Sequence, residues 1–423
     1  MNAIIENMKA YIVSLGCPKN LTDTETIMEK LASKGCGFTN DPSEADLILV
    51  NTCAFLQSAK QEAIDTIKGL AKWKKKGKCK YLIAAGCLPQ RYKNECPRLL
   101  PEVDAFIGTP GRFVEESRKQ IADSRKRALI KATPPWFAYV KIAEGCGNRC
   151  AYCMVPMIRG PLRIRPVKNI LNEVKLLAKA GVKEIIYVAQ DTTTHPKFAD
   201  LLRKTARIKG VHWIRVMYAH PAHVTDKLIN VMAKEKKIVK YLDLPIQHAH
   251  DKILSQMRRR YTRQDLENLI LRIRRRIPEI ALRTSVIVGF PGEGEAEFEE
   301  LLDFIGRIRF ERLGAFAFSR EEGTPAHKMR GQVPKSKKIK RFHRLMRVQA
   351  RVARELNEKM VGKTLDIMME RKVRGGFVGR SPMDAPDIDG TVFVRTSQSF
   401  KPGEIIRARI TGARTYDLIG CTP

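Results

Sequence analysis

The sequence has no long apolar run. Nothing in its 423 residues approaches the length of about 20 apolar residues that spans a bilayer, so it predicts no membrane helix. The first residues, Met1 to Asn7, include an acid and lack the apolar segment of a secretory signal, and we therefore expect a cytoplasmic protein. Ten cysteines in such a chain do not predict a disulfide framework, but favour metal binding or catalysis.

Acidic residues are scarce relative to basic ones. The chain has 45 Asp and Glu against 78 Lys and Arg, which gives a formal net charge of +33. This excess favours contact with a polyanion, with RNA as the first candidate, while the alternative is a generally basic solvated surface. The basic runs are dispersed, and runs such as Arg258-Arg259-Arg260 usually coat exposed faces, so they do not identify a site.

The composition, 43% hydrophobic and 29% charged, is that of a folded globular protein with room for several domains. Short apolar runs in the first part of the chain alternate with helical patterns, and these runs are residues 10–15, 46–52 and 81–85. This alternation predicts a doubly wound parallel α/β domain over residues 8–125. We expect Thr22 or Asp23 to cap its first helix.

A second series of strand-like runs follows. They are Ala138–Ile142, Ile185–Ala189, Trp213–Tyr218, Val239–Leu244, Ala281–Val288 and Arg312–Phe318. Helical patterns separate them, which predicts a parallel sheet with its site at the carboxyl ends of the strands. Six units are too few for a complete eight-fold barrel, so we expect an open, partial (β/α)6 barrel over residues 133–333.

The chain changes character near its end. Residues 334–360 form one basic helical stretch, which we expect to connect two domains. Over residues 361–423, short β-like runs separated by Gly, Pro and Asp predict a small all-β barrel, similar to a TRAM domain. The predicted fold class is therefore α/β, with a doubly wound sheet, a partial barrel and a terminal β-barrel.

Three cysteines lie close together directly after the first barrel strand. Cys146, Cys150 and Cys153 form a C-x3-C-x2-C run. Three thiolates on one tight loop can hold three irons of a cubane cluster and leave the fourth iron open for a substrate or cofactor. Zinc sites usually show paired C-x2-C knuckles or a nearby His, and this run has neither. The spacing therefore predicts a 4Fe-4S cluster.

Another three cysteines are spread along the first domain. Cys17, Cys53 and Cys87 each follow one of its predicted strands. Because the carboxyl ends of parallel strands meet at one edge of a sheet, we expect the three to lie together. Any one of them alone would be better explained as a buried structural cysteine. Three at equivalent positions favour a second three-cysteine cluster.

The loop cysteines resemble the signature of the radical S-adenosylmethionine (SAM) enzymes. The whole organisation, from about Lys9 to the C-terminus, resembles the methylthiotransferases of that superfamily. Residues 14–20, 86–92 and 188–193 are similar to the RimO-like branch, which modifies an aspartate of small-subunit ribosomal protein twelve. The MiaB-like branch, which modifies an adenosine of transfer RNA, would show Gly-Cys-Gln-Met-Asn where this chain has Gly-Cys-Pro-Lys-Asn at residues 16–20.

This resemblance implies an enzyme that adds a methylthio group to the aspartate β-carbon, with SAM as both methyl donor and radical source. It implies two 4Fe-4S clusters, the radical cluster on the loop cysteines and an auxiliary cluster on Cys17, Cys53 and Cys87. It also implies an electron donor of the flavodoxin or ferredoxin type, a sulfur donor, and contact with ribosomal RNA through the basic surface. No membrane partner is expected.

Polar residues at or just past the barrel strand ends are candidates for contacts with SAM or substrate. They are Gln190, Asp191, Arg215, His220, Asp243, Gln247, His248, Arg283, Ser285 and Ser319. Structural hydrogen bonding is the alternative role for each. Gly289 and Gly292 resemble the family's turn against the adenine and would allow close backbone approach, although an ordinary glycine turn has the same pattern.

Two other functions stay open. The same chemistry on transfer RNA is favoured by the net charge and opposed by the motifs. An RNA-binding assembly factor whose clusters only sense redox state would turn over no SAM. Methionine and 5′-deoxyadenosine among the products would therefore exclude the assembly factor.

Overall fold

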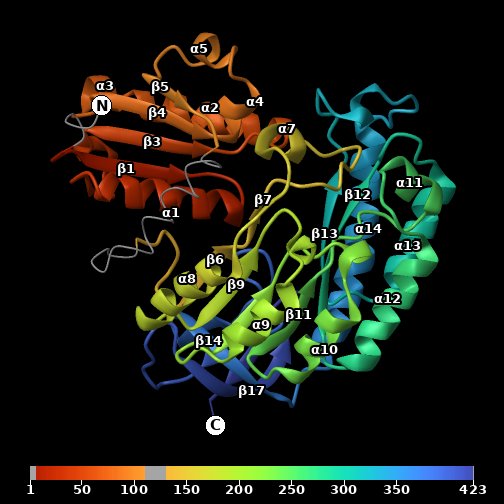
Figure 1. Cartoon of the computed structure of the whole chain (residues 1–423). Helices are drawn as coiled ribbons and strands as arrows, with labels where there is room; N and C mark the ends of the chain where they lie inside the picture. Colours follow the sequence, from red (N-terminus) through yellow and green to blue (C-terminus); the bar gives the residue numbers. More distant parts are fainter. Residues whose placement is uncertain (1–5, 110–129, 423) are drawn as a thin grey trace.

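The computed structural model describes residues 6–109 and 130–422. Its first sheet is parallel, with strand order β2-β1-β3-β4-β5 (Figure 1). The strands are β1 (Lys9–Ser14), β2 (Gly37–Phe38), β3 (Leu47–Thr52), β4 (Tyr81–Gly86) and β5 (Ala105–Ile107). β1, β3 and β4 coincide with the three predicted runs. The pairing aligns Ser14 with Asn51 and Thr52 with Gly86, so these three strands end at one edge.

The helices of this region are α1 (Pro18–Ala32), α2 (Gln57–Ala71), α3 (Trp73–Lys76), α4 (Cys87–Arg91) and α5 (Cys96–Leu99). The predicted start of the first helix is wrong, because α1 begins at Pro18, with Cys17 at its N-cap. Proline suits the first helical position, where its fixed φ matches the helix and no N–H partner is needed. Thr22 and Asp23 are consequently buried inside α1. Two cysteines therefore border helix N-termini, Cys17 before α1 and Cys87 as the first residue of α4.

The second sheet is parallel and open, with strand order β13-β12-β11-β10-β9-β6. Its strands are β6 (Phe137–Lys141), β9 (Glu184–Val188), β10 (Trp213–Val216), β11 (Ile238–Asp243), β12 (Ala281–Val288) and β13 (Arg312–Ala317). The open partial barrel is thus confirmed. A short hairpin, β7 (Ala143–Glu144) with β8 (Arg163–Ile164), follows β6 and encloses the loop cysteines between its strands.

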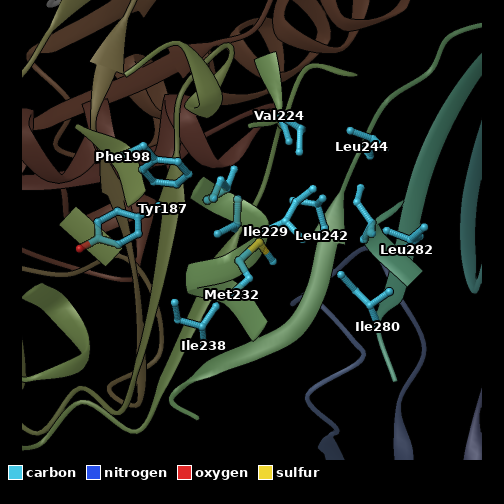
Figure 2. Close-up of a cluster of buried hydrophobic side chains, with 14 of the residues drawn as sticks. Tyr187, Phe198, Val224, Ile229, Met232, Ile238, Leu242, Leu244, Ile280 and Leu282 are labelled. Carbon is cyan, nitrogen blue, oxygen red and sulfur yellow. The ribbon is translucent and has the colours of Figure 1, made fainter. Parts of the chain in front are cut away.

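Helices cover the outer face of this sheet (Figure 1). They are α8 (Val167–Lys179), α9 (Phe198–Ala206), α10 (Asp226–Lys234), α11 (Asp251–Gln256), α12 (Arg263–Arg276) and α13 (Glu295–Ile308). A further short helix, α7 (Val155–Arg159), contacts α4 of the first domain instead. The core lies between strands and helices: Figure 2 shows Leu242 and Leu282 of the sheet near Ile229 and Met232 of α10, all nearly inaccessible to solvent. Burial of apolar area at this interface is the main stabilising contribution.

The basic stretch is one helix, α14 (Lys335–Glu358), which contacts β13 and α13. A closed barrel follows, with strand order β14-β15-β16-β18-β17. Its strands are β14 (Thr364–Val373), β15 (Gly376–Arg380), β16 (Val392–Arg395), β17 (Ile405–Ala413) and β18 (Leu418–Cys421). This barrel packs on the inner side of the open sheet, where Met368 and Ala385 join a buried cluster with Phe137 and Tyr241.

The fold class predicted from the sequence is confirmed, whereas the domain boundaries stay predictions. The boundary placed at residue 125 lies outside the described residues. Within residues 6–109 and 130–422, no helix is both long and apolar enough to cross a membrane.

Candidate active site

The three cysteines of the first sheet come together because the strand ends are aligned and the turns after them are tight. Gly16 has φ +89°, and a Cβ there would lie 2.9 Å from the Cys53 Sγ. Gly86 has φ +91°, and a Cβ there would lie 2.3 Å from Asn51 Oδ1. A side chain at either position would collide with the neighbouring loop, so glycine is required. These close approaches gather Cys17, Cys53 and Cys87 at one edge.

The electrostatic surroundings of these thiols differ. Burial raises the pKa of Cys53 to about 11 and also raises the pKa of Cys87. At Cys17 burial acts in the same direction, but the charges of Lys19 and Arg159 and the N–H groups at the start of α1 outweigh it and lower the pKa. Arg159 also donates from Nη2 to the Cys87 Sγ at 3.5 Å. The charge of Arg159 acts against burial at all three sulfurs, in the direction that favours thiolates, the form that binds metal.

Each loop cysteine receives a hydrogen bond on sulfur. The N–H of Asn148 donates to Cys146 at 3.5 Å, and the N–H of Val155 donates to Cys153 at 3.4 Å. The buried Arg259 donates from Nη1 to the Cys150 Sγ at 3.5 Å. Donors to thiolate sulfur are a usual feature around iron–sulfur clusters, where they tune the reduction potential.

The donor sets fit iron–sulfur clusters better than single zinc ions. All six cysteines are free thiols. Tetrahedral zinc with Zn–S bonds of about 2.3 Å would bring its sulfurs to within about 4 Å of one another. Among the described residues, the one set of three Cys, His, Asp or Glu ligand atoms mutually within 4.8 Å is Asp191, His220 and His223, so neither cysteine set is that compact. A larger inorganic core suits both sets.

Both cysteine sets border a cavity of about 440 Å³ at the carboxyl ends of the barrel strands. Cys17 lines it from the first sheet, and the three loop cysteines line it from the barrel. Seven of the residues predicted to contact cofactor or substrate also line it: Gln190, His220, Asp243, Gln247, Arg283, Ser285 and Ser319. Aromatic side chains also line this cavity, namely those of Tyr218, Phe316 and Phe318. One chamber therefore reaches both sets.

Asp191 lies behind the cavity wall and holds the cysteine loop. Its carboxylate accepts hydrogen bonds from Asn148 Nδ2 at 2.8 Å and from Thr193 Oγ1 at 2.6 Å, and it pairs with His223 Nδ1 at 2.7 Å. Burial raises the pKa of this carboxyl, but these hydrogen bonds outweigh the effect and lower it. Burial and the charge of Arg259 lower the pKa of the adjacent His220 to about 3. Because Asp191 holds Asn148 of the cysteine loop, we assign it a positioning role.

Four further residues predicted to contact cofactor or substrate do not line the cavity: Arg215, His248, Gly289 and Gly292. Arg215 is fully buried in the middle of β10, where its Nε donates to Glu184 at 2.7 Å and its Nη1 to the Pro382 carbonyl at 2.9 Å. It therefore fastens the terminal barrel to the sheet. The N–H of Gly289 donates a hydrogen bond to the Glu293 carboxylate at 2.8 Å, as in an ordinary glycine turn. His248 is likewise buried, 3.5 Å from the same carboxylate.

Several site residues escaped sequence reasoning. Arg259 belongs to a basic run that predicted an exposed face, yet its side chain is buried against Cys150 because the loop after α11 folds under the cysteine loop. Arg159 and Tyr218 gave no sequence signal, since distant segments create their surroundings. Lys19, next to the Cys17 region, could have been found by its place two residues beyond a predicted ligand.

A buried ion-pair network joins the two cysteine regions. Asp23 of α1 pairs with both Lys141 and Arg159, and Lys141 also pairs with Glu144 at 2.7 Å. Arg159 further donates to Asn20 Oδ1 at 3.2 Å. All these side chains are largely buried, so the charges depend on one another for stability.

Replacing Arg159 alone should therefore be costly. We expect Arg159→Gln to lower the free energy of unfolding by about 3–5 kcal/mol, because Asp23 loses one of its two cationic partners in a buried place. The charge-balanced double variant Asp23→Asn/Arg159→Gln should lose less. Urea unfolding of the apoproteins, followed by tryptophan fluorescence, measures both. Equal losses in the single and double variants would contradict an electrostatic role for Arg159.

Comparison with protein families divides the chain into three matched regions. Residues 140–305 match the radical SAM superfamily, and residues 361–422 match the TRAM domain. Residues 9–108 match the uncharacterized protein family UPF0004. The solved structure of the radical SAM methyltransferase TsrM from Kitasatospora setae has the same fold, with a TM-score of 0.59 at 12% identity over 83% of this chain and 90% of that chain.

Curated relatives match over nearly the full length. The ribosomal protein uS12 methylthiotransferase RimO of Lachnoclostridium phytofermentans is 44% identical, with 98% of this chain and 99% of that protein covered. The protein of the same name from Geobacter sulfurreducens is also 44% identical, with 97% and 98% covered. This identity shows the family that the motifs around the cysteines had indicated. The chain belongs to the RimO family of uS12 methylthiotransferases, within the radical SAM superfamily.

Proposed function

We propose that this protein transfers a methylthio group to the β-carbon of an aspartate in ribosomal protein uS12. The observation that carries the proposal is the shared cavity, which places Cys17 of one cysteine set and all three cysteines of the other around one chamber. Methylthio transfer needs two functions at one substrate carbon, removal of hydrogen and delivery of sulfur. A chamber reached by two distinct cysteine sets meets that need, and the curated relatives carry this activity in their names.

We assign Cys146, Cys150 and Cys153 to the cluster that binds SAM, and Cys17, Cys53 and Cys87 to an auxiliary cluster. When bound, the first cluster and SAM supply the radical chemistry that an unactivated C–H bond requires, which acid–base side chains cannot supply. Support for the first assignment comes from the three hydrogen bonds donated to the loop sulfurs. Support for the second comes from the convergence of three strand ends.

The chain's own side chains would shape and protect the reaction chamber. Gln190, Asp243, Gln247, Arg283 and Ser285 line the barrel side of the cavity, where they would bind SAM and substrate. Arg283 pairs with Asp243 at 2.9 Å, so both are held in fixed positions. Tyr218 and Phe318 give the chamber an apolar part of its wall, which would limit the access of water to reactive species.

The proposal includes partners beyond the substrate. Reductive cleavage of SAM requires an electron, so we include a donor of the flavodoxin or ferredoxin type, and the added sulfur requires a sulfur donor. The net charge of +33 and the TRAM match support contact with ribosomal RNA around the substrate. Such a substrate would place the enzyme in the cytoplasm.

Incubation of the reconstituted enzyme with two substrates tests the function. Under anaerobic, reducing conditions with SAM, we expect mass spectrometry to show one added methylthio group on uS12 and none on transfer RNA. Net charge brings the enzyme to either substrate, but only the cavity discriminates between them. Reactions without SAM serve as the control. Modification of transfer RNA alone would reverse the assignment, and the absence of SAM turnover with either would favour a redox-sensing assembly factor.

A further inference from the structure

The cavity wall carries one cation, Lys19, whose charged group has neither a carboxylate nor a hydrogen-bond partner among the described residues. Lys19 lies in the first turn of α1, two residues beyond Cys17, and its side chain is 9% exposed. Its Nζ lies 3.4 Å from the centroid of the Tyr218 ring. Within the described part of the chain, its ammonium group has no carboxylate partner. The other two cations of the wall are matched, Arg283 by Asp243 at 2.9 Å and Arg259 by Cys150 and the Pro245 carbonyl.

An ammonium group in this position is expensive unless an anion joins it. Burial of a charge is destabilising when no partner compensates it. The contact with the Tyr218 ring offsets only part of that cost. The chamber therefore favours an anionic ligand at this end.

The backbone conformation of Tyr218 is a second, independent observation that indicates a ligand-binding site beside Lys19. It has φ +59°, an uncommon conformation for an aromatic residue, and it is kept there by a hydrogen bond from its N–H to Asp243 at 3.0 Å. Residues held in such conformations are strained and concentrate at ligand-binding sites. Here the strained backbone sets the ring under the Lys19 ammonium, facing the cavity.

We propose that the Lys19 ammonium binds the carboxylate of the substrate aspartate. This inference rests on the proposed function. The β-carbon of an aspartate is bonded directly to its carboxylate carbon, so an anchor on the carboxylate also fixes the reacting carbon. Because Lys19 stands beside Cys17, this anchor places the β-carbon near the auxiliary cysteines while its free face turns to the loop cysteines. Lys19 thus selects an acidic side chain over a neutral one.

A carboxylate in this cavity has two possible sources, the substrate aspartate and the methionine moiety of SAM. Lys19 lies on α1, two residues beyond Cys17 of the auxiliary set, whereas SAM in this family binds at the loop cysteines of the barrel. The position of Lys19 therefore favours the substrate. If Lys19 binds the substrate carboxylate, removal of its charge weakens the binding of uS12. If it binds the carboxylate of SAM, the same change weakens the binding of SAM, so binding measurements separate the two sources.

The test compares uS12 with a uS12 in which the modified aspartate is replaced by asparagine. Calorimetry on the reconstituted enzyme without SAM measures binding in the absence of turnover. We expect the enzyme to bind the aspartate form about tenfold or more tightly, and Lys19→Met to bind both forms alike, since a charge-assisted hydrogen bond is lost. Lys19→Arg, which keeps the charge, should retain part of the preference and shows whether a folding defect explains the loss.

Lys60 provides a matched control. Its Nζ lies 3.6 Å from the Tyr92 ring centroid, the same kind of contact outside the cavity lining, so Lys60→Met should keep the aspartate preference. In turnover assays, Lys19→Met should raise the KM for uS12, and Lys60→Met should leave it unchanged.

Three results would overturn the proposal for Lys19. Weaker SAM binding with an unchanged aspartate preference would assign the carboxylate to the cofactor. A fall in iron content would mean that Lys19 acts through Cys17, whose pKa it lowers. If Lys19→Met still modifies uS12 and keeps the preference for the aspartate form, Lys19 does not bind the substrate carboxylate, and the proposed function is unaffected. If the wild-type enzyme neither binds nor modifies uS12, the proposed function fails first.

Discussion

Alanine at Cys146, Cys150 and Cys153 is expected to remove about half of the iron and to abolish cleavage of SAM. Two cubane clusters hold about eight irons, and each depends on three protein thiolates. Residues 146–153 contain no further Cys, His, Asp or Glu, so the loop offers no other thiolate, imidazole or carboxylate to replace the three sulfurs. Iron and sulfide analysis after anaerobic reconstitution measures the first effect, and chromatography of 5′-deoxyadenosine measures the second.

The chain supplies its own control for that experiment. Cys36, Cys79 and Cys96 are free, buried thiols that pack in the apolar core of the first sheet and do not line the cavity. A triple alanine variant at these positions loses as many thiols, yet it should reconstitute to the full iron content and cleave SAM. A loop variant that keeps the full iron content would show that the ligand assignment is wrong.

The positions of the long strands along the chain could be predicted, because each of these strands is a separate apolar run. β3 is buried along its whole length, and a strand buried on both faces has an unbroken apolar sequence. The edge strands β2 and β5 escaped prediction because they have two and three residues, too few to show a pattern. The start of α1 was misplaced because the polar residues Thr22 and Asp23 resemble a cap, although the contact of Asp23 with Lys141 explains their burial.

The site was predictable where its chemistry is local in the sequence. The loop cysteines lie within a segment of eight residues, Cys146 to Cys153, and the other three follow strands whose ends must meet. The side chains that tune those sulfurs were not predictable. Arg159 reaches Cys87 across 72 positions, and Arg259 reaches Cys150 across 109. Contacts of this kind depend on the packing of whole segments, which no short pattern encodes.

The second large effect separates the two cysteine sets by role. Replacing Cys17, Cys53 and Cys87 with alanine should leave SAM cleavage intact and stop methylthio transfer to uS12. The groups that support the loop cysteines come from the barrel itself: Asp191 holds Asn148, and Arg259 contacts Cys150. None of these contacts passes through the first sheet, so radical generation should not depend on the auxiliary cysteines.

The measurements are 5′-deoxyadenosine formed, iron retained and the mass of uS12 from one reaction. We expect about half of the iron, continued formation of 5′-deoxyadenosine and an unmodified uS12. Arg159 is the residue through which loss of the auxiliary cysteines could disturb the loop cysteines, because it contacts both Cys87 and the Asp23 network. Its guanidinium keeps the Asp23 partner after the cysteines are gone, so α7 and the adjoining loop should hold their place. Loss of SAM cleavage in a folded variant that retains the loop iron would show that the two cysteine sets work as a single unit.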